Sequence, residues 1–157
     1  MVALEVGWSE FIGPYSTLPT PTSIRLLEVA PGRPIRCSFQ SVHLDDFPVY
    51  AALSYTWGNP RGVLPPGEYA ETDRIATSRK EPILCDGRTM SIPVNCFEFL
   101  EQYQDLIDFV RSVDYDPQDL NLSTDNKYYI WIDALCIIQD SIGERARQVR
   151  IMDRVYR

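Results

Sequence analysis

The sequence predicts an α/β domain whose core is a parallel sheet, and three observations favour this class. Two short apolar runs, residues 49–55 and 128–133, have the length and uniform hydrophobicity of strands buried on both faces. An amphipathic helical pattern over about residues 96–112 separates them. A second helical pattern follows from residue 141. Strand, helix, strand and helix in this order are typical of a parallel α/β core.

The composition is that of an acidic globular protein. The chain has 157 residues, of which 45% are hydrophobic, and its 15 basic and 22 acidic residues give a net charge of -7. The acidic balance argues against a nucleic-acid partner, which needs a net basic face. No apolar run approaches the roughly 20 residues that span a bilayer, and the N-terminus lacks the features of a signal peptide. We therefore expect a cytoplasmic protein with no membrane span.

Residues 1–48 are expected to form an irregular lead-in and a small antiparallel hairpin, and residues 49–157 the main domain. The lead-in, residues 1–22, contains three prolines and no periodicity. Residues 24–29 and 35–44 have strand patterns on either side of a Pro-Gly turn. This hairpin is interpreted as a decoration of the parallel core.

A second hairpin and a helix are predicted between the two core strands. Asp86-Gly87 joins two short strands and supplies the positive φ angles of a type I′ turn. Asn95, with Glu98 three residues later, is expected to cap the helix over 96–112. Its apolar stripe is predicted to contain Phe97, Leu100, Tyr103 or Gln104, Ile107 and Val110. The acidic face opposite is interpreted as a solvated surface.

The last helix is predicted to begin after Ser141, which forms a capping-box pattern with Glu144. Its apolar stripe contains Ile142, Ala146, Val149, Met152 and Tyr156 and is predicted to face the core. Glu144 lies opposite this stripe and is therefore expected to face away from the core. Arg145 is expected to face solvent or to bind a phosphate group.

The cysteines do not have the spacing of a metal site. Cys37, Cys85, Cys96 and Cys136 contain no CxxC pair, and His43 is the only histidine. A structural zinc site needs four ligands at short paired spacings, so no metal is expected. We interpret Cys37, Cys85 and Cys136, which lie in apolar or strand-like contexts, as buried free thiols, and we expect a reducing compartment.

Polar and aromatic residues follow both core strands at their carboxyl ends, where parallel sheets bind ligands. The ligand-binding candidates are Ser54, Tyr55, Trp57 and Gly58 after the first strand, and Asp133, Gln139 and Arg145 after the second. We expect residues of both groups to surround one concavity.

Each candidate also has a structural interpretation. Tyr55 and Trp57 either pack against the strand end or stack on a ligand ring. Asp133 either accepts backbone N–H groups of its own loop or orients a ligand hydroxyl. Glu144 either serves the helix N-terminus or acts as a catalytic carboxylate. Cys136 is interpreted as a core residue rather than a nucleophile.

These residues give the sequence a resemblance to the fungal heterokaryon-incompatibility (HET) domain. Residues 50–58, Tyr-Ala-Ala-Leu-Ser-Tyr-Thr-Trp-Gly, resemble the first block of that family. Residues 131–156 resemble its second block, which begins Trp-Ile-Asp-Ala-Leu-Cys-Ile. Ile138 stands where the family usually has Asn. The family's third block, an Arg-x-Trp-Thr-Leu-Gln-Glu-like run, does not occur before Arg157, so we expect an incomplete domain.

The resemblance implies a module of fungal non-self recognition that signals programmed cell death through protein partners or self-association. The HET domain is also remotely similar to TIR domains, flavodoxin-like modules some of which cleave NAD. That similarity implies a nucleotide hydrolase with NAD as its substrate and its catalytic glutamate in the third block. Asp133 and Glu144 are the weaker catalytic candidates here, and we expect this chain alone not to hydrolyse NAD. A structural domain of a larger fungal protein is the remaining alternative, and no cofactor is implied.

Overall fold

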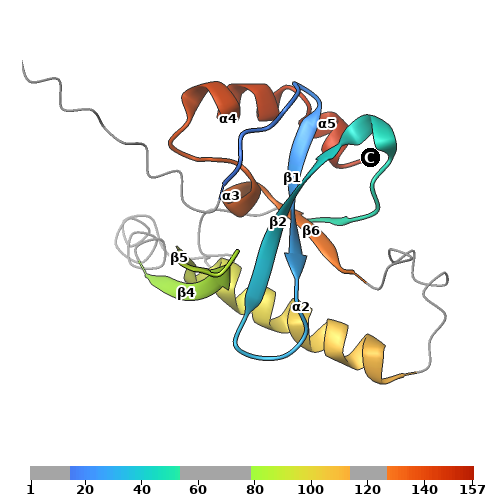
Figure 1. The fold of residues 1–157 in the computed structure, drawn as a ribbon, viewed down its shortest axis with the longest axis vertical. Coiled ribbons are helices and arrows are strands. Elements are labelled where there is room, and N and C mark those ends of the chain that lie inside the picture. Colours follow the sequence, from blue (N-terminus) through green and yellow to red (C-terminus); the bar gives the residue numbers. More distant parts are fainter. Residues whose placement is uncertain (1–14, 54–78, 114–126) are drawn as a thin grey trace, which may run out of the picture.

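The computed structural model describes residues 15–53, 79–113 and 127–157, and within these ranges the strands form one six-stranded mixed sheet (Figure 1). The strand order is β3-β6-β1-β2-β4-β5. The strands are β1 (Ser23–Val29), β2 (Arg36–His43), β3 (Ala51–Leu53), β4 (Lys80–Cys85), β5 (Arg88–Pro93) and β6 (Tyr129–Ile132). The helical elements are the 3-10 helix η1 (Leu44–Asp46), α2 (Val94–Ser112), α3 (Asp133–Cys136), α4 (Ile142–Val149) and α5 (Met152–Val155). In Figure 1, α4 and α5 lie at one end of the sheet and α2 at the other.

The two predicted core strands confirm the α/β class. β3 and β6 are adjacent and parallel, with Ala51 opposite Ile130 and Leu53 opposite Ile132. The α2 helix lies between them in the chain, as a parallel connection requires. Both strands therefore end at the same edge of the sheet, and Asp133 begins α3 at that edge.

The sheet as a whole is mixed rather than parallel, because the N-terminal hairpin lies at its centre. β1 and β2 are antiparallel, with Val29 opposite Cys37, which confirms the predicted hairpin. β1 also pairs antiparallel with β6, so the interpretation of the hairpin as a decoration was wrong. Residues from both faces of β1 are buried, as is typical of a strand in the interior of a sheet that is covered on both faces. The division after residue 48 stays a prediction, although the strands on both sides of it belong to one sheet.

The structure confirms the predicted second hairpin. β4 and β5 are antiparallel, and the two residues between them, Asp86 and Gly87, have φ angles of 49° and 73°. These positive values are those of the type I′ turn. The hairpin joins the sheet through parallel pairing of β4 with β2.

The α2 helix begins two residues earlier than predicted, and Asn95 does not cap it. Pro93 occupies the N-cap position without a side-chain hydrogen bond, while the Oδ1 atom of Asn95 accepts a hydrogen bond from the N–H of Cys96 at 3.2 Å. Proline is favoured at helix starts because its missing N–H would have no partner there. The buried residues are Cys96, Leu100, Gln104 and Ile107, so the predicted stripe is confirmed at Leu100 and Ile107 and extends to Cys96.

All four cysteines are buried and free, which confirms the interpretation of Cys37, Cys85 and Cys136 as core thiols and adds Cys96 to them. Cys37 and Cys85 lie opposite each other on β2 and β4. Cys136 lies on α3 and is fully buried. Among the residues that the structure describes, no helix is both long enough and apolar enough to cross a membrane.

The burial pattern of α2 predicts how two leucines of that helix respond to truncation. Leu100→Ala is expected to lower the free energy of unfolding by about 2–5 kcal/mol, because Leu100 is fully buried. Leu106→Ala should change it by less than about 0.5 kcal/mol, because Leu106 is exposed. Urea titrations of the two variants provide the comparison, and equal losses would show that the core has been misplaced.

Candidate functional site

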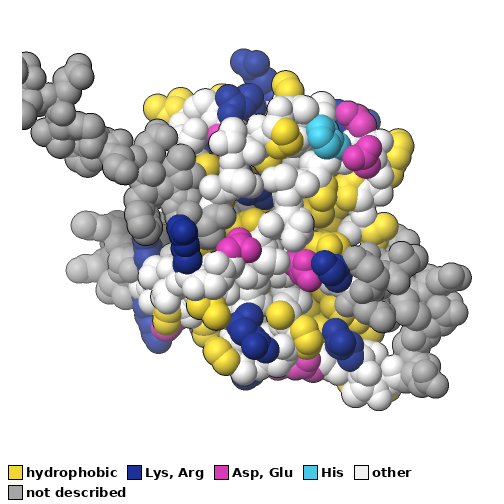
Figure 2. All heavy atoms as spheres, in the orientation of Figure 1, with side chains coloured by type: hydrophobic (Ala, Val, Ile, Leu, Met, Phe, Trp, Pro, Cys, Tyr) yellow, Lys and Arg dark blue, Asp and Glu magenta, His cyan; other side chains and the backbone are white. Residues whose placement is uncertain are grey.

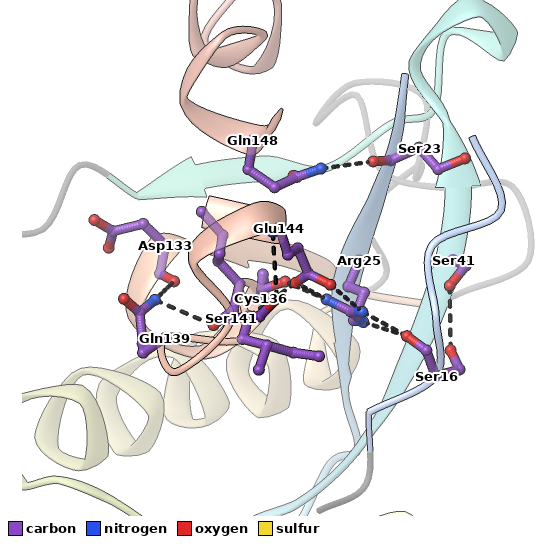
Figure 3. Close-up of polar contacts among 12 residues, drawn as sticks. Ser16, Ser23, Arg25, Ser41, Asp133, Cys136, Gln139, Ser141, Glu144 and Gln148 are labelled. Atoms are coloured by element: carbon purple, nitrogen blue, oxygen red, sulfur yellow. Dashed lines mark hydrogen bonds and ion pairs between the residues drawn. The ribbon is translucent and has the colours of Figure 1, made fainter. Parts of the chain in front are cut away.

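The polar centre of the molecule is an ion pair between Arg25, in the middle of β1, and Glu144, in the first turn of α4 (Figure 3). The guanidinium meets the carboxylate through two contacts, Nη1–Oε1 at 2.5 Å and Nη2–Oε2 at 2.9 Å. The two side chains are 0% and 5% exposed. A bidentate, charge-assisted pair of this kind is strong, and its removal from solvent makes each partner dependent on the other.

Backbone groups from three further segments complete the hydrogen bonds of this pair. Arg25 donates to the carbonyl oxygen of Ser16 and, at 3.2 Å, to that of Cys136. Glu144 accepts a hydrogen bond from the N–H of Ile138 at 2.8 Å. The Arg25 guanidinium also lies 5.3 Å from the centre of the Tyr15 ring. The pair therefore joins the segment before β1, the end of α3, the loop after it and α4.

The ionisation of the neighbouring groups follows from this arrangement. Burial raises the pKa of Glu144, but the hydrogen bonds from Arg25 and Ile138 lower it more, so the net pKa lies below its usual value. Burial raises the pKa of the Cys136 thiol to about 12. The thiol is therefore protonated at neutral pH, which supports the interpretation of Cys136 as a core residue.

The sequence prediction that Glu144 faces away from the core was wrong, and so was the predicted apolar stripe of the last helix. Glu144 and Gln148 are buried, whereas Ile142 is 75% and Val149 58% exposed. Arg25 explains the inversion. Leaving its buried guanidinium without a counter-charge would cost about 3–5 kcal/mol, so Glu144 takes the inward position and the aliphatic side chains of this helix stay in solvent.

The polar side of α4 makes two more contacts. Gln148 donates to the carbonyl oxygen of Ser23 at 2.9 Å. The Oγ atom of Ser141 accepts a hydrogen bond from the N–H of Glu144 at 3.3 Å, which confirms the predicted N-cap. The Glu144 side chain contacts Arg25 rather than the N-cap backbone. The helix ends at Val149, and α5 begins at Met152 after a break.

Asp133 and Gln139 lie together at the carboxyl end of β6. The Oδ1 atom of Asp133 accepts a hydrogen bond from the N–H of Ala134 at 2.7 Å, so the structural alternative for this residue is present. Gln139 donates to the carbonyl oxygens of Asp133 and Ile137 at 2.8 and 3.1 Å. In Figure 3 the Asp133 carboxylate points away from the Arg25–Glu144 pair. Asp133 and the exposed Asp140, in the loop after α3, form no ion pair with the described residues.

The remaining candidates fall in two groups. Ser54, Tyr55, Trp57 and Gly58 lie outside the described residues. Arg145 is exposed on α4, away from the buried Glu144. The expected concavity formed by both blocks stays a prediction, and its described members are Asp133 and Gln139.

Sequence reasoning missed Arg25, although a signal was present. Arg25 stands inside an otherwise apolar run, Ile-Arg-Leu-Leu, and such a strand has no solvated face to accept a charge. A buried arginine requires a carboxylate partner, and Glu144 lies 119 residues away in the chain. The existence of the pair was therefore predictable, but the identity of its acidic partner was not.

The pair is suited to hold the domain together and not to transfer protons. Both Glu144 oxygens are engaged by Arg25, and one also accepts from Ile138. A general acid or base must reach the proton that it exchanges, and a buried, fully bonded carboxylate does not. The residues at the carboxyl ends of β3 and β6 are left as the candidates for ligand contact.

Comparisons with known proteins identify relatives of this sequence. Residues 50–157 match the family model of the heterokaryon incompatibility protein (HET). The chain is also 29% identical over 139 residues to heterokaryon incompatibility protein 6, OR allele, of Neurospora crassa. That alignment covers 86% of this chain but 17% of the relative, so the chain spans a small part of its length. No solved structure matches the chain significantly.

Breaking the buried ion pair is expected to destabilise the domain more than removing it whole. Glu144→Ala should lower the free energy of unfolding by about 3–5 kcal/mol, because Arg25 stays buried without a counter-charge. The double variant Arg25→Met, Glu144→Leu should lose much less, because both charges are gone. Urea titrations give the free energies, and Arg154→Met, which breaks the exposed pair with Asp45, is the control, with an expected loss below about 1 kcal/mol. A double variant as unstable as Glu144→Ala would contradict this account.

The lowered pKa of Glu144 also predicts an acid-sensitive stability. The pKa is below 4.5 in the folded state, so the stabilisation is present above that pH and is lost as the pH falls through the folded pKa. The urea midpoint of the wild type should therefore fall more between about pH 6 and pH 3 than that of Glu144→Gln. Added salt of roughly 0.5 M screens the exposed Asp45–Arg154 pair and separates its contribution. Parallel pH curves for the two proteins would refute the assignment.

Proposed function

This chain belongs to the heterokaryon incompatibility (HET) family, and from that membership we propose that it acts in fungal non-self recognition and signals programmed cell death in the cytoplasm. The relative in Neurospora crassa is named for heterokaryon incompatibility, which supports the first part of the proposal. The signal is proposed to pass by association with a protein partner or with another copy. The aligned segment is 17% of that relative, so the proposal concerns the HET module and not a whole protein of that length.

The family match over both sequence blocks is the observation that carries the proposal. The state of the carboxylates supports association rather than catalysis as the mode of action. Glu144 is committed to Arg25, and Asp133 is held through one oxygen by the N–H of Ala134. Neither group has the arrangement expected of a dedicated acid and base pair.

A TIR-like NAD hydrolase is the second candidate, and the position of Asp133 is the observation that favours it. Cleavage of the bond between nicotinamide and ribose passes through an oxocarbenium-like state, which a positioned carboxylate stabilises. Asp133 follows β6 at the edge where β3 also ends, the place where α/β sheets bind ligands. A single short carboxylate is a weak constellation, and we propose that this chain alone does not turn over NAD.

Induced expression of the chain in a filamentous fungus tests the proposed function. We expect growth arrest and uptake of a vital dye by the hyphae, and Trp57→Ala, in the first family block, should reduce both by at least about tenfold. Arg79→Met, which breaks the exposed pair with Glu81, is the control variant and should behave as the wild type. Purified chain incubated with NAD should release no nicotinamide above background.

The other outcomes separate the alternatives. Robust release of nicotinamide that is lost in Asp133→Asn would favour the hydrolase. Normal growth in cells that accumulate the folded chain would favour a structural domain of a larger protein and would overturn the proposal.

A further inference from the structure

A groove of about 930 Å³ runs along β3 and is bounded by the segment from η1 to β3, the start of β6 and the residues of α5. We call it the β3 groove. Its walls are apolar and rich in tyrosine, and its charged lining residues are Lys127, Arg154 and Arg157. No Asp or Glu is among the described residues that line it. Figure 2 shows hydrophobic side chains at the surface along the segment that contains η1 and β3.

The β3 groove carries apolar side chains that the chain itself leaves in solvent. Phe47 is 88% exposed, and Val49 and Tyr156 are each exposed by more than two fifths. Contiguous exposed apolar surface of this kind marks an interaction site more often than a random feature of a monomer. The β3 strand beside the groove is also an edge strand of the sheet.

Phe47 ends η1, and this position explains its backbone conformation. Its φ angle is 51°, in the left-handed region, and its N–H donates to the carbonyl oxygen of Leu44 at 3.2 Å, as is common at a helix C-cap. The ring itself is almost fully exposed, so the helix end presents it to solvent beside the groove.

The cations of the β3 groove are paired with carboxylates of the same chain that lie outside the groove. Lys127, Arg154 and Arg157 pair with Glu28, Asp45 and Asp153, three carboxylates that do not line the groove. These ion pairs are at least partly exposed, and exposed pairs contribute little and exchange readily. The β3 groove therefore fits an apolar element that carries negative charge.

One surface of this chain has that chemistry. Leu106, Phe109 and Val113 follow one another at spacings of three and four residues along α2 and its C-cap, and the first two are 54% and 62% exposed. Asp105 and Asp108 are exposed beside them, and Asp105 forms an exposed ion pair with Arg33. We call these five residues the α2 stripe. An amphipathic helix with apolar anchors at i, i+3 and i+7 is the usual occupant of an apolar groove.

We propose that the β3 groove of one copy binds the α2 stripe of a second copy. The two surfaces are complementary in charge and in apolar character. They are also close on one molecule, because Tyr103 of α2 lines the β3 groove. A two-fold axis then places each stripe in the groove of the other copy, which closes the assembly as a dimer. The dimer deepens the proposed function and rests on it for its biological role, whereas its formation is a property of the purified chain.

The test is a charge exchange measured by sedimentation equilibrium of the purified chain. Asp108→Lys alters only the stripe and Arg157→Glu alters only the groove, and each protein alone should dimerise at least about tenfold more weakly than the wild type. An equimolar mixture should regain the wild-type affinity, because each interface of the mixed dimer then joins opposite charges. Phe47→Ser and Phe109→Ser should each weaken the dimer at least about tenfold.

The matched control lies on α4, which has exposed apolar and basic residues and does not line the β3 groove. Figure 2 shows dark blue Lys and Arg side chains over this helix. Ile142→Ser and Val149→Ser remove apolar side chains that are as exposed as those of the stripe and should leave the dimer unchanged. Phe47→Gly should raise the urea midpoint of dilute, monomeric protein and still weaken the dimer, because glycine relieves the positive φ angle.

Three results would overturn the dimer. These are a monomeric wild-type chain up to submillimolar concentration, a mixture of the charge variants that stays monomeric, and a dimer that is lost in Val149→Ser but kept in Phe109→Ser. None of them bears on the growth assay, so failure of the dimer and failure of the proposed function are distinguishable.

Discussion

A guanidinium buried in the middle of a sheet must be neutralised, and this requirement at Arg25 organises the domain. The counter-charge comes from Glu144, and the backbone groups of Ser16, Cys136 and Ile138 complete the set. Glu144 lies within the residues that match the HET family and Arg25 lies before them. The pair therefore joins the N-terminal hairpin to the family domain. Without that hairpin, Glu144 would be a buried carboxylate with no cation.

The same requirement decides what α4 presents to solvent. Because Glu144 and Gln148 must point inward, the residues on the other side, Ile142 and Val149, point outward. The helix thus exposes apolar side chains next to arginines, against the usual rule for amphipathic helices. Glu144 takes the inward position because the buried guanidinium of Arg25 would otherwise lack a counter-charge, at a cost of about 3–5 kcal/mol. The two exposed aliphatic side chains forgo a comparable amount, about 1.5–3 kcal/mol each. The inward position also removes Glu144 from chemistry and leaves Asp133 and Asp140 as the described carboxylates that follow β6 and form no ion pair with the described residues.

Local features were predictable from the sequence, and long-range features were not. The Asp86-Gly87 turn and the parallel pairing of β3 with β6 follow from turn chemistry and from apolar runs of strand length. The inward side of α4 does not follow from its own periodicity, because its orientation is set by Arg25, which lies far away in the chain. The central place of β1 depends on which strands pair with its two edges. Only the assembled sheet decides this. The candidate site was predictable to the extent that Asp133 and Gln139 follow one strand.

The ion pair and the β3 groove are connected through the last two helices. Arg25 fixes α4 through Glu144, and α5 follows α4 after a short break. Val155 and Tyr156, at the end of α5, form one wall of the groove. That wall is held by the hydroxyl of Tyr50, which donates to the carbonyl oxygen of Val155 at 2.8 Å, and by the edge contact of Tyr156 with Trp131 at 5.6 Å. The shape of the groove therefore depends on a charge pair buried elsewhere in the domain, so the association surface exists only while the N-terminal hairpin and the HET domain remain joined.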